Sequence, residues 1–565
     1  MASLWGDEFV VMPTNGADIL KKAVTKASNE EIARINYSKA LKSKSVSIED
    51  KLQIIRENVN KILGRYKENT VVIKSREELT KYIDKAIQNG VIAIDTETNN
   101  SLDTLTCILM GGCIYTPGMK NAYIPINHTS TILRKRLEWQ LTEKDLKEEF
   151  ARLQNTKIIM HNGKFDYQVI KNTCGIALDV YWDTMIAARL LNENEEAGLK
   201  YQYVNKVDRT IEKYSIEHLF AQIEYAIVEP ELFALYAATD AFMTYKLYEY
   251  QLAEMTKKKY KRLFDLFLNV EMPIMTVTAE MELYGVCIDS NYANILSEKY
   301  RKKSEEAQLE IDKELELLAP NIRKWRLTAD AKYHPVKGSA GNKPGKPEVN
   351  GIELRENDVY GREKSKDEQL SDPVNIASPQ QLAILLYDVL RVPPVDRNSP
   401  RSTGEKILEQ IDLPICELIL KKRKISKILE TYVDKIPACV SPKDGRLHAQ
   451  FKQLGTETGR FSSTEPNLQN IPSKIKEIRM MFVPSPGYSI VGSDFSQQEP
   501  RILAQFSQDK RMLDAYHNDK DLYATIGDGI NHLGYWENME HYEDGSGNEE
   551  GKKRRKKMKV VYLGE

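Results

Sequence analysis

Five side chains between positions 95 and 240 have the types and spacing that metal-dependent hydrolysis requires. Asp95 and Glu97 end the apolar run VIAIDTE, and an extended backbone would point both carboxylates to one side. Asp166 follows a second apolar run, TKIIMHN, after a short turn. Tyr236 and Asp240 are four residues apart in a helical pattern, which predicts that they lie on one face of a helix.

Four carboxylates that converge provide what a pair of divalent cations needs. Magnesium prefers oxygen ligands, and two ions roughly 4 Å apart can stabilise both the attacking and the leaving oxygen of a phosphoryl displacement. We therefore expect Asp95, Glu97, Asp166 and Asp240 to bind two Mg²⁺ or Mn²⁺ ions. The Tyr236 hydroxyl, one helical turn from Asp240, would orient the attacking water.

Each of these motifs is common on its own and could arise by chance. Their order and their placement on strands and helices together resemble the DEDDy group of 3′–5′ exonucleases. The resemblance includes Asn162 before Asp166 and the segment Asp183-Thr184-Met185. It implies an α/β exonuclease domain with an RNase H-like mixed sheet and flanking helices.

A second group of candidate residues lies between positions 445 and 505. Arg460 stands in TGRFSS, and Gln469 and Asn470 stand in NLQNIP. The run SIVGSDFS predicts a buried strand that ends at Asp494, where a carboxylate could hold magnesium beside an incoming triphosphate. Glu499 follows five residues later.

These residue types suit the mouth of a polymerase site. Arg460 could reach a duplex near the primer terminus. The amides of Gln469 and Asn470 suit minor-groove acceptors, which look similar for all base pairs. Taken in isolation, the same three residues would fit a hydrogen-bonded turn that never meets DNA.

The second group closely resembles family A DNA polymerases, which include bacterial polymerase I and many phage replicases. The segments EMPIMTVTAEMELYGVCID, SPQQLAILLYDVL and STGEKILEQI extend the resemblance to nearly everything from about residue 70 onward. It implies a DNA-directed DNA polymerase with proofreading, acting in replication. It also implies that Glu499 packs under the sugar and disfavours a ribose 2′-hydroxyl. The style of the motifs favours a phage source.

The basic run RRKKMKVVYLGE resembles the start of the family's nucleotide-binding helix. It supplies Arg555 and Lys559, whose spacing places both on one helical face toward a triphosphate. On the family's pattern a second palm carboxylate would follow Glu565, so we expect an incomplete polymerase site beside an intact exonuclease site. We also expect the basic run to be frayed. A designed truncation, a gene interrupted by an intron or intein, and a split polymerase completed by a second chain all remain open.

The pattern along the chain predicts an α/β domain, then a mostly helical thumb, then a partial α+β palm. The expected divisions are an N-terminal helical extension without assigned role (1–70), the exonuclease domain (71–255), the thumb region (256–440) with a polar insertion (328–373), the palm portion (441–520) and the start of the fingers (521–565).

Composition is that of an ordinary globular protein, with 41% hydrophobic and 29% charged residues. The formal net charge is −1, so a nucleic-acid surface would need local concentration of its cations. The six cysteines form no CxxC pair, which argues against a zinc site and suits a reducing compartment. No signal peptide and no run of roughly 20 apolar residues is found, so we expect a cytoplasmic protein of a bacterial or phage-infected cell, without membrane contact.

The expected partners are primer–template DNA, single-stranded 3′ ends and, in the complete enzyme, deoxynucleoside triphosphates. Two other functions compete with this one. A standalone metal-dependent 3′–5′ exonuclease with a DNA-binding palm remnant would not need the motifs at 445–505. A non-catalytic nucleic-acid-binding scaffold would not need the four acids.

Overall fold

The computed structural model describes residues 47–210, 219–220, 223–333, 348–349, 352–353, 370–371 and 373–563, without the side chains of 326–333, 348–353 and 563. The chain divides into two compact units, one that ends at Val483 and one that runs from Pro484 to Glu565. Most of the predicted insertion at 328–373 and the first 46 residues of the predicted extension lie outside the described residues.

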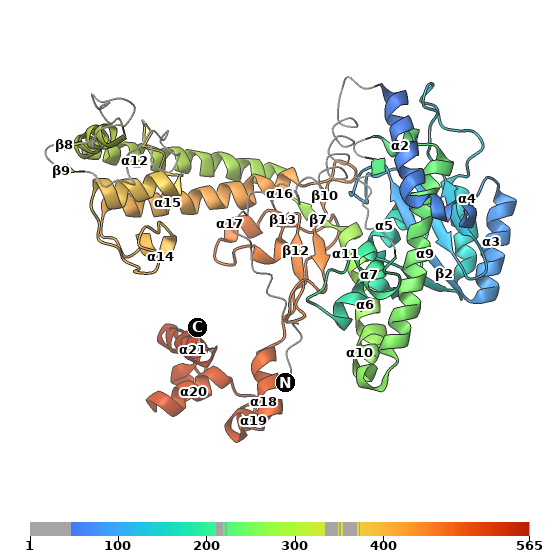
Figure 1. Ribbon diagram of the computed structural model, residues 1–565. Helices are drawn as coiled ribbons and strands as arrows, with labels where there is room; N and C mark the ends of the chain where they lie inside the picture. Colours follow the sequence, from blue (N-terminus) through green and yellow to red (C-terminus); the bar gives the residue numbers. More distant parts are fainter. Residues whose placement is uncertain are drawn as a thin grey trace, which may run out of the picture. The chain divides into compact units, whose positions relative to one another are not determined.

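A six-stranded mixed sheet forms the centre of an α/β domain that extends over residues 48–284 (Figure 1). The strand order is β1-β4-β3-β2-β5-β6, with β3 antiparallel to both of its neighbours and the other pairs parallel. The mixed sheet predicted from the sequence is thereby confirmed. The strands are β1 Thr70–Val72, β2 Val91–Thr98, β3 Leu109–Tyr115, β4 Asn121–Pro125, β5 Lys157–Met160 and β6 Val180–Asp183.

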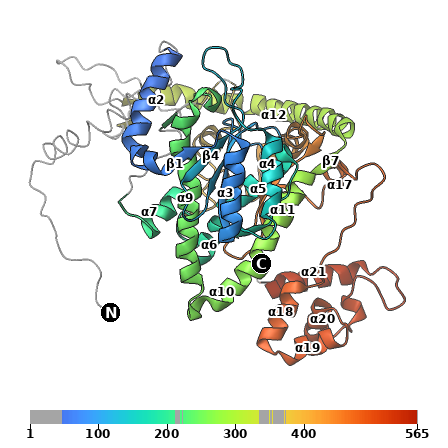
Figure 2. The ribbon, with the colours of Figure 1, turned by 90° about the vertical axis from the view of Figure 1, so that its right-hand side faces the viewer.

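Helices cover both faces of this sheet, which explains why β3 and β4 are buried along their whole length. Helix α9 (Pro230–Met255) crosses one face, and α3 (Arg76–Asn89), α4 (Glu143–Phe150) and α5 (Gly163–Cys174) lie on the other (Figure 2). Helix α2 (Ile48–Leu63) packs on α9 and buries three apolar residues. The core therefore begins before the predicted boundary at 71, and it continues to Ala279 in α11 (Met272–Tyr284).

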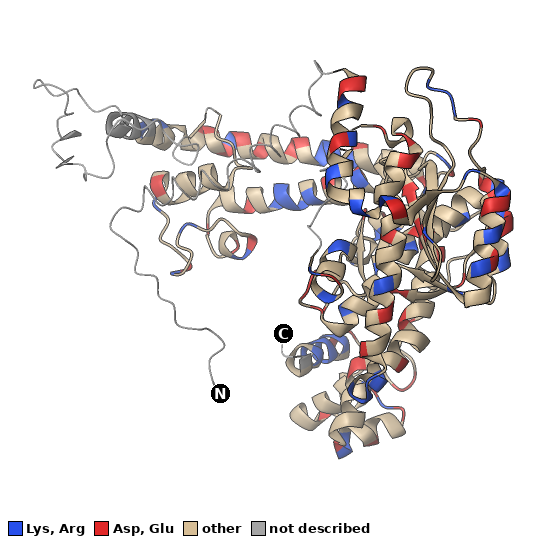
Figure 3. Ribbon diagram, turned by 45° about the vertical axis from the view of Figure 1, so that its right-hand side comes forward, with Lys and Arg blue, Asp and Glu red and all other residues tan. Residues whose placement is uncertain are grey.

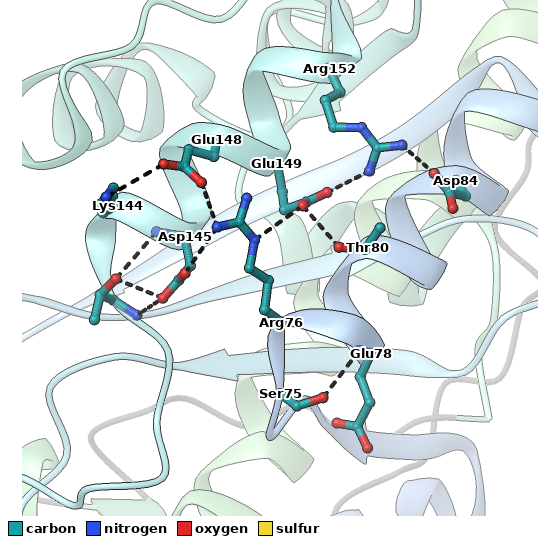
Figure 4. A network of polar contacts seen from close by, with 11 residues as sticks. Ser75, Arg76, Glu78, Thr80, Asp84, Lys144, Asp145, Glu148, Glu149 and Arg152 are labelled. Carbon is teal, nitrogen blue, oxygen red and sulfur yellow. Dashed lines mark hydrogen bonds and ion pairs between the residues drawn. The ribbon is translucent and has the colours of Figure 1, made fainter.

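A polar network joins α3 to α4 (Figure 4). Arg76 of α3 lies 2.5 Å from the Glu148 carboxylate and 3.6 Å from that of Glu149. Glu149 is nearly buried and also accepts from Thr80 at 2.9 Å and from Arg152 at 2.6 Å. Because two guanidinium groups and a hydroxyl surround it, the buried Glu149 charge is compensated, and the two helices are fixed side by side over the sheet.

The buried carboxylate of Asp183 connects two helix starts. Its Oδ2 accepts from the backbone N–H of Gly163 at 2.7 Å, at the start of α5, and its Oδ1 accepts from Met185 at 2.8 Å, at the start of α6 (Thr184–Leu191). A Cβ on Gly163 would stand 2.7 Å from Met160 Cβ, so only glycine lets α5 turn this closely off β5. Asp183 thus fixes the start of the helix that carries Asp166.

A buried histidine holds the chain just before α9. His128 Nδ1 lies 3.0 Å from the carbonyl oxygen of Val228, which can only accept, so Nδ1 carries the proton. Its Nε2 then accepts from the Tyr123 hydroxyl at 2.7 Å. Burial lowers the pKa of His128 to about 4, so the ring stays neutral.

Beyond the α/β domain, the first unit continues with a long helix pair. Helix α12 (Ser290–Tyr333) packs along α15 (Pro414–Ile428), which runs into the π-helical turn η9 (Leu429–Val433). Helix α13 (Pro379–Ala383) has Ser378 as its N-cap and Pro379 at its first position. The described part has no helix long and apolar enough to cross a bilayer.

Short strands follow the helix pair. Strands β10 (Arg446–Leu447), β7 (Val286–Ile288) and β13 (Phe482–Val483) form a three-stranded antiparallel sheet. A separate hairpin pairs β11 (Gln450–Lys452) with β12 (Ser462–Thr464). Strands β10 to β13 lie in the part of the sequence expected to be palm (441–520), whereas β7 lies in the predicted thumb region (256–440).

The second unit is helical in its described residues, and it corrects two predictions. The segment 489–495 forms no strand, and its apolar side chains Ile490, Val491 and Phe495 are exposed. The prediction of a buried strand was wrong because a strand needs a neighbour to pair with, and no described residue pairs with this segment. Helix α21 (Glu549–Leu563) is continuous, so the expected fraying was also wrong.

Asp183 provides a test of how α5 is held in place. In the Asp183→Ala variant four backbone N–H groups lose their acceptor, and we expect the free energy of unfolding of the α/β domain to fall by about 3 kcal/mol or more. Asp183→Asn keeps an acceptor for α6 but presents an N–H₂ to Gly163, so an intermediate loss is expected. Hydrogen exchange of the 163–174 peptide measures both, and wild-type protection in the alanine variant would contradict this role.

The lowered pKa of His128 predicts that the free energy of unfolding of the α/β domain decreases at acidic pH. Its pKa falls from 6.5 to about 4 on folding, so the unfolded chain binds a proton in this pH window that the folded chain does not. Stability from this group is complete above pH 6.5 and decreases toward pH 4, by about 1.4 kcal/mol per pH unit. His128→Gln removes this term. Hydrogen exchange of β4 peptides from pH 7 to 4.5 should therefore show a shallower loss of protection in the variant, and parallel curves would refute the assignment.

Candidate active sites

Two carboxylates meet at the carboxyl end of β2, in the middle of the sheet. The ligand atoms of Asp95, Glu97 and Cys113 all lie within 4.8 Å of one another. The register of the sheet explains this cluster, because Asp95 pairs with Cys113 on the neighbouring strand β3. Asp95 and Glu97 therefore share one face of the sheet, as their spacing predicted.

Asp166 reaches the same strand from the first turn of α5. Its Oδ1 accepts from the backbone N–H of Thr96 at 2.8 Å and from the Thr96 hydroxyl at 2.7 Å. The Thr96 N–H is available because β5 pairs with β2 only as far as Ala93. Because β2 and β5 no longer pair beyond Ala93, Asp166 can form hydrogen bonds with Thr96 of β2.

Tyr236 and Asp240 lie on one buried stretch of α9, one helical turn apart, as predicted. The Tyr236 ring packs edge-on against Phe220, with centroids 5.8 Å apart. Asp240 forms an ion pair with Lys200 of α7 (Leu199–Lys206), and the Lys200 ammonium also lies 5.1 Å from the centre of the Tyr236 ring. Lys200 belongs to no motif that the sequence singled out.

Burial and mutual repulsion dominate the electrostatics of this cluster. Burial raises the pKa of Asp95 to about 7, although the Lys200 charge opposes the rise. Burial and the neighbouring acids raise the pKa of Glu97 and of Asp166 well above their usual range. Buried like charges at this separation are unfavourable unless cations neutralise them, which is the arrangement expected of a metal-binding site.

The residues present fit hard divalent cations. Asp95, Glu97, Asp166 and Asp240 offer oxygen ligands, and Asp95 and Glu97 already lie close enough to share an ion. Burial and the adjacent acids raise the pKa of the Cys113 thiol well above its usual range, so it stays protonated and is a poor ligand. The donor set is therefore one of carboxylates, which suits Mg²⁺ or Mn²⁺.

The second unit contains four predicted residues of the nucleotide site. Asp494 is exposed on the extended segment, and Glu499 lies in the first turn of α18 (Gln498–Ser507). Arg555 of α21 lies 2.7 Å from the Asp521 carboxylate and 3.0 Å from that of Glu540. Lys559, one turn further along α21, is exposed.

Asp521 connects the segment after Asp494 to α21. Its Oδ2 accepts from the Gln497 side chain at 2.6 Å as well as from Arg555, and its Oδ1 caps α20 (Leu522–Asn531) through the N–H of Ala524. The sequence analysis did not identify this residue, because its partners lie 24 and 34 positions away. Two predicted parts of the nucleotide site, the Asp494 segment and Arg555, thus meet at one carboxylate.

The three predicted DNA contacts lie in the first unit. Arg460 is exposed in the turn between β11 and β12, where its carbonyl oxygen accepts from the Thr456 hydroxyl at 2.8 Å. Gln469 and Asn470 are exposed in the 3₁₀ turn η10 (Leu468–Asn470), which the Tyr432 hydroxyl fixes through the Asn470 carbonyl at 3.0 Å. The side chains therefore project from turns whose backbones are held by the protein.

Lysine and arginine residues also cluster on α15 and on α21 (Figure 3). The two clusters differ in the contacts that their side chains make within the protein. In the KKRK run of α15, Lys421 pairs with Glu310, Lys422 donates to Ser304 and Arg423 donates to the Thr403 carbonyl. In α21, Lys556, Lys557 and Lys559 are exposed. Lys421, Lys422 and Arg423 of α15 thus form an ion pair or hydrogen bonds within the protein, without any phosphate.

Comparison with known proteins finds two families. Residues 70–256 match the model of a 3′–5′ exonuclease, and residues 354–543 match that of DNA polymerase family A. The DNA polymerase I of Borreliella burgdorferi is 29% identical over 460 residues, which cover 80% of this chain and 43% of the relative. That of Synechocystis is 30% identical over 465 residues, which cover 80% of this chain and 40% of the relative.

The chain spans less than half the length of these curated relatives. Among solved structures, the POL domain of Pol1 from M. smegmatis in complex with DNA primer-template and dNTP shares the fold, with a TM-score of 0.59 and 20% identity. That likeness covers 87% of this chain and 71% of the other. The chain is thus similar to DNA polymerase family A over residues 354–543 and to 3′–5′ exonucleases over residues 70–256.

Proposed function

We propose that the α/β domain removes nucleotides from single-stranded 3′ DNA ends in a reaction that depends on two Mg²⁺ or Mn²⁺ ions. The observation that carries the proposal is that Asp95 and Glu97 meet at the end of β2, with Asp166 held against Thr96 between them, while Asp240 of α9 pairs with Lys200, whose charge acts on Asp95 and Glu97. The family of residues 70–256 supports it. In the whole protein this activity would proofread DNA synthesis during replication.

Each side chain has a defined task in this proposal. Asp95, Glu97, Asp166 and Asp240 would hold the two ions, which would supply positive charge to the reacting phosphate and to the attacking and leaving oxygens. Tyr236, fixed in orientation by Phe220, presents its hydroxyl toward the water that attacks.

The second half of the proposal is that residues 441–565 contribute to a DNA-directed DNA polymerase site. Asp494 would hold a metal ion, Glu499 would exclude the ribose hydroxyl, and Arg555 and Lys559 would contact the triphosphate. Arg460, Gln469 and Asn470 would hold primer–template duplex. Support comes from the family of residues 354–543 and from the junction at Asp521, which links the Asp494 segment to Arg555.

An exonuclease without polymerase activity is the second candidate, favoured by one observation. Glu97, Asp166 and Asp240 are buried and Asp95 is partly buried, whereas Asp494 is exposed on a segment that pairs with no described strand. A labelled primer–template with Mg²⁺ and all four deoxynucleotides separates the two, using the Asp95→Asn variant to prevent degradation. Templated extension supports the polymerase, and an unchanged primer supports the exonuclease alone.

The exonuclease proposal predicts the effect of removing single carboxylate charges. Asp95→Asn and Asp240→Asn preserve side-chain volume, so the fold should persist while degradation of single-stranded DNA falls by at least about 100-fold. A 5′-labelled oligonucleotide should give a ladder that shortens from the 3′ end. Asp265→Asn, which removes an exposed carboxylate of α10 (Lys261–Leu266), is the matched control and should leave the rate unchanged. Wild-type rates in both site variants would refute the assignment.

The duplex-binding proposal predicts a loss that does not depend on DNA sequence. Arg460→Ala should weaken binding of matched duplexes equally and reduce the slope of log affinity against log salt by about 1. Fluorescence anisotropy at several salt concentrations, with two unrelated duplexes, measures both quantities. Arg65→Ala, an exposed cation of the α/β domain, serves as the control. A loss confined to one of the two duplexes would count against a polymerase-type groove.

A further inference from the structure

Glu282, near the end of α11, has a buried carboxylate with donors on both of its oxygens. Its Oε1 lies 2.6 Å from the ammonium of Lys164 and accepts from the backbone N–H of Phe451, and its Oε2 accepts from the side chain of Gln168 at 2.7 Å. The Lys164 ammonium also donates to the Phe451 carbonyl oxygen. Glu282 therefore joins α5, which carries Lys164 and Gln168 and packs along α11 (Figure 2), to strand β11, which carries Phe451.

Asp166 lies between these two contacts along α5, but on the opposite face of the helix. Lys164 and Gln168 are four residues apart and share one face, and Asp166, two residues from each, points away from that face. On its own side, Asp166 accepts from the backbone N–H and the hydroxyl of Thr96 in β2. Helix α5 is thus held from two sides, by Thr96 beside the metal-binding acids and by Glu282 beside β11.

The segment that contains β11 is itself fixed to the α/β domain. His448 Nδ1 lies 2.6 Å from the backbone carbonyl oxygen of Glu282, and the Gln453 amide donates to the Glu271 carboxylate at 2.7 Å. Leu454 packs against the apolar core of the domain. Strand β11 is therefore an anchored support for α5, although it belongs to the region of the sequence expected to be palm.

We propose that Glu282 is a positioning residue of the exonuclease site, which holds α5 against β11 so that Asp166 stays in place beside the acids of β2. The proposal rests on the exonuclease function proposed above. It means that the site is not complete within residues 70–256, because α11 and β11 supply one of the two supports of α5. A ligand displaced by about 1 Å can lower the rate of a reaction by about 100-fold.

The test compares Glu282→Gln with the matched control Glu280→Gln. Glutamine keeps the volume at position 282, but it cannot neutralise the Lys164 ammonium, and whichever way its amide is turned, the N–H₂ group meets another donor. Glu280 lies on the same helix α11 and pairs with Lys171, further along α5, where both side chains are partly exposed. The control thus removes an equal charge between the same two helices.

The first measurement is hydrogen exchange of the 163–174 peptide, without metal or DNA. Exchange should be at least about tenfold faster in Glu282→Gln and unchanged in Glu280→Gln. Gln168→Met removes a single donor to Glu282, so it should have a smaller effect in the same direction. Added to Glu282→Gln, it should change exchange by less than the two single effects predict, because both variants break the same contact.

The second measurement is degradation of a 5′-labelled single-stranded oligonucleotide at increasing Mg²⁺. Glu282→Gln should raise the Mg²⁺ concentration for half-maximal activity by at least about fivefold and lower kcat, with KM for DNA unchanged. Glu280→Gln should match the wild type. A purely structural role would reduce the number of active molecules but leave the Mg²⁺ response of the remaining ones unchanged.

Unchanged exchange of the 163–174 peptide, or an unchanged Mg²⁺ response, in Glu282→Gln would overturn the proposal. So would a raised KM for DNA with an unaltered Mg²⁺ response, because the released Lys164 ammonium would then act on substrate phosphate. Failure of the exonuclease function gives a different result. In that case Asp95→Asn would degrade DNA as the wild type does, and the positioning role would fall with the site that it serves, even if exchange were still faster in Glu282→Gln.

Discussion

The confinement of like charges in one buried pocket is the constraint on which the α/β domain depends. Burial raises the pKa values of Asp95, Glu97 and Asp166, and the Asp95 charge raises those of Glu97 and Asp166 further. Such a cluster stores unfavourable electrostatic energy that cations release on binding. Lys200 supplies one positive charge from within the chain, and the remainder has to come from outside it.

Holding these charges together requires a rigid frame, and the frame is built from backbone as much as from side chains. Strand β2 pairs with β5 from Val91 to Ala93 and with β3 from Ala93 to Thr98, so the Thr96 N–H lies beyond the pairing with β5 and is free for Asp166. Asp183 fixes the start of α5, and His128 fixes the chain before α9. The polar network of Arg76, Glu149 and Arg152 holds α3 and α4 over the sheet. Each acid is therefore carried by an element that is anchored elsewhere.

In the second unit, the predicted site residues are held by side-chain contacts and not by a sheet. Asp494 lies on an exposed, unpaired segment, so neighbouring strands do not fix its position. Asp521 instead connects three parts of this unit, because its carboxylate caps α20 and accepts hydrogen bonds from both Gln497 and Arg555. The ion pair between Arg555 and Asp521 would have to weaken before the guanidinium could make its full set of hydrogen bonds to a phosphate. The strength of this ion pair therefore opposes the binding of a phosphate by Arg555.

The sequence by itself determined the elements and the residue types of the exonuclease site. Period-two apolar runs ending in Asp95 and Glu97, and the four-residue spacing of Tyr236 and Asp240, predict which side chains share a face, because strand and helix geometry is local. Only the tertiary structure decided the rest. Lys200, Asp183 and Asp521 meet their partners across gaps of 20 to 40 residues, which no local pattern encodes. The run at 489–495 has the composition of a strand, yet strand formation depends on a pairing neighbour, and that is a property of the fold and not of the segment.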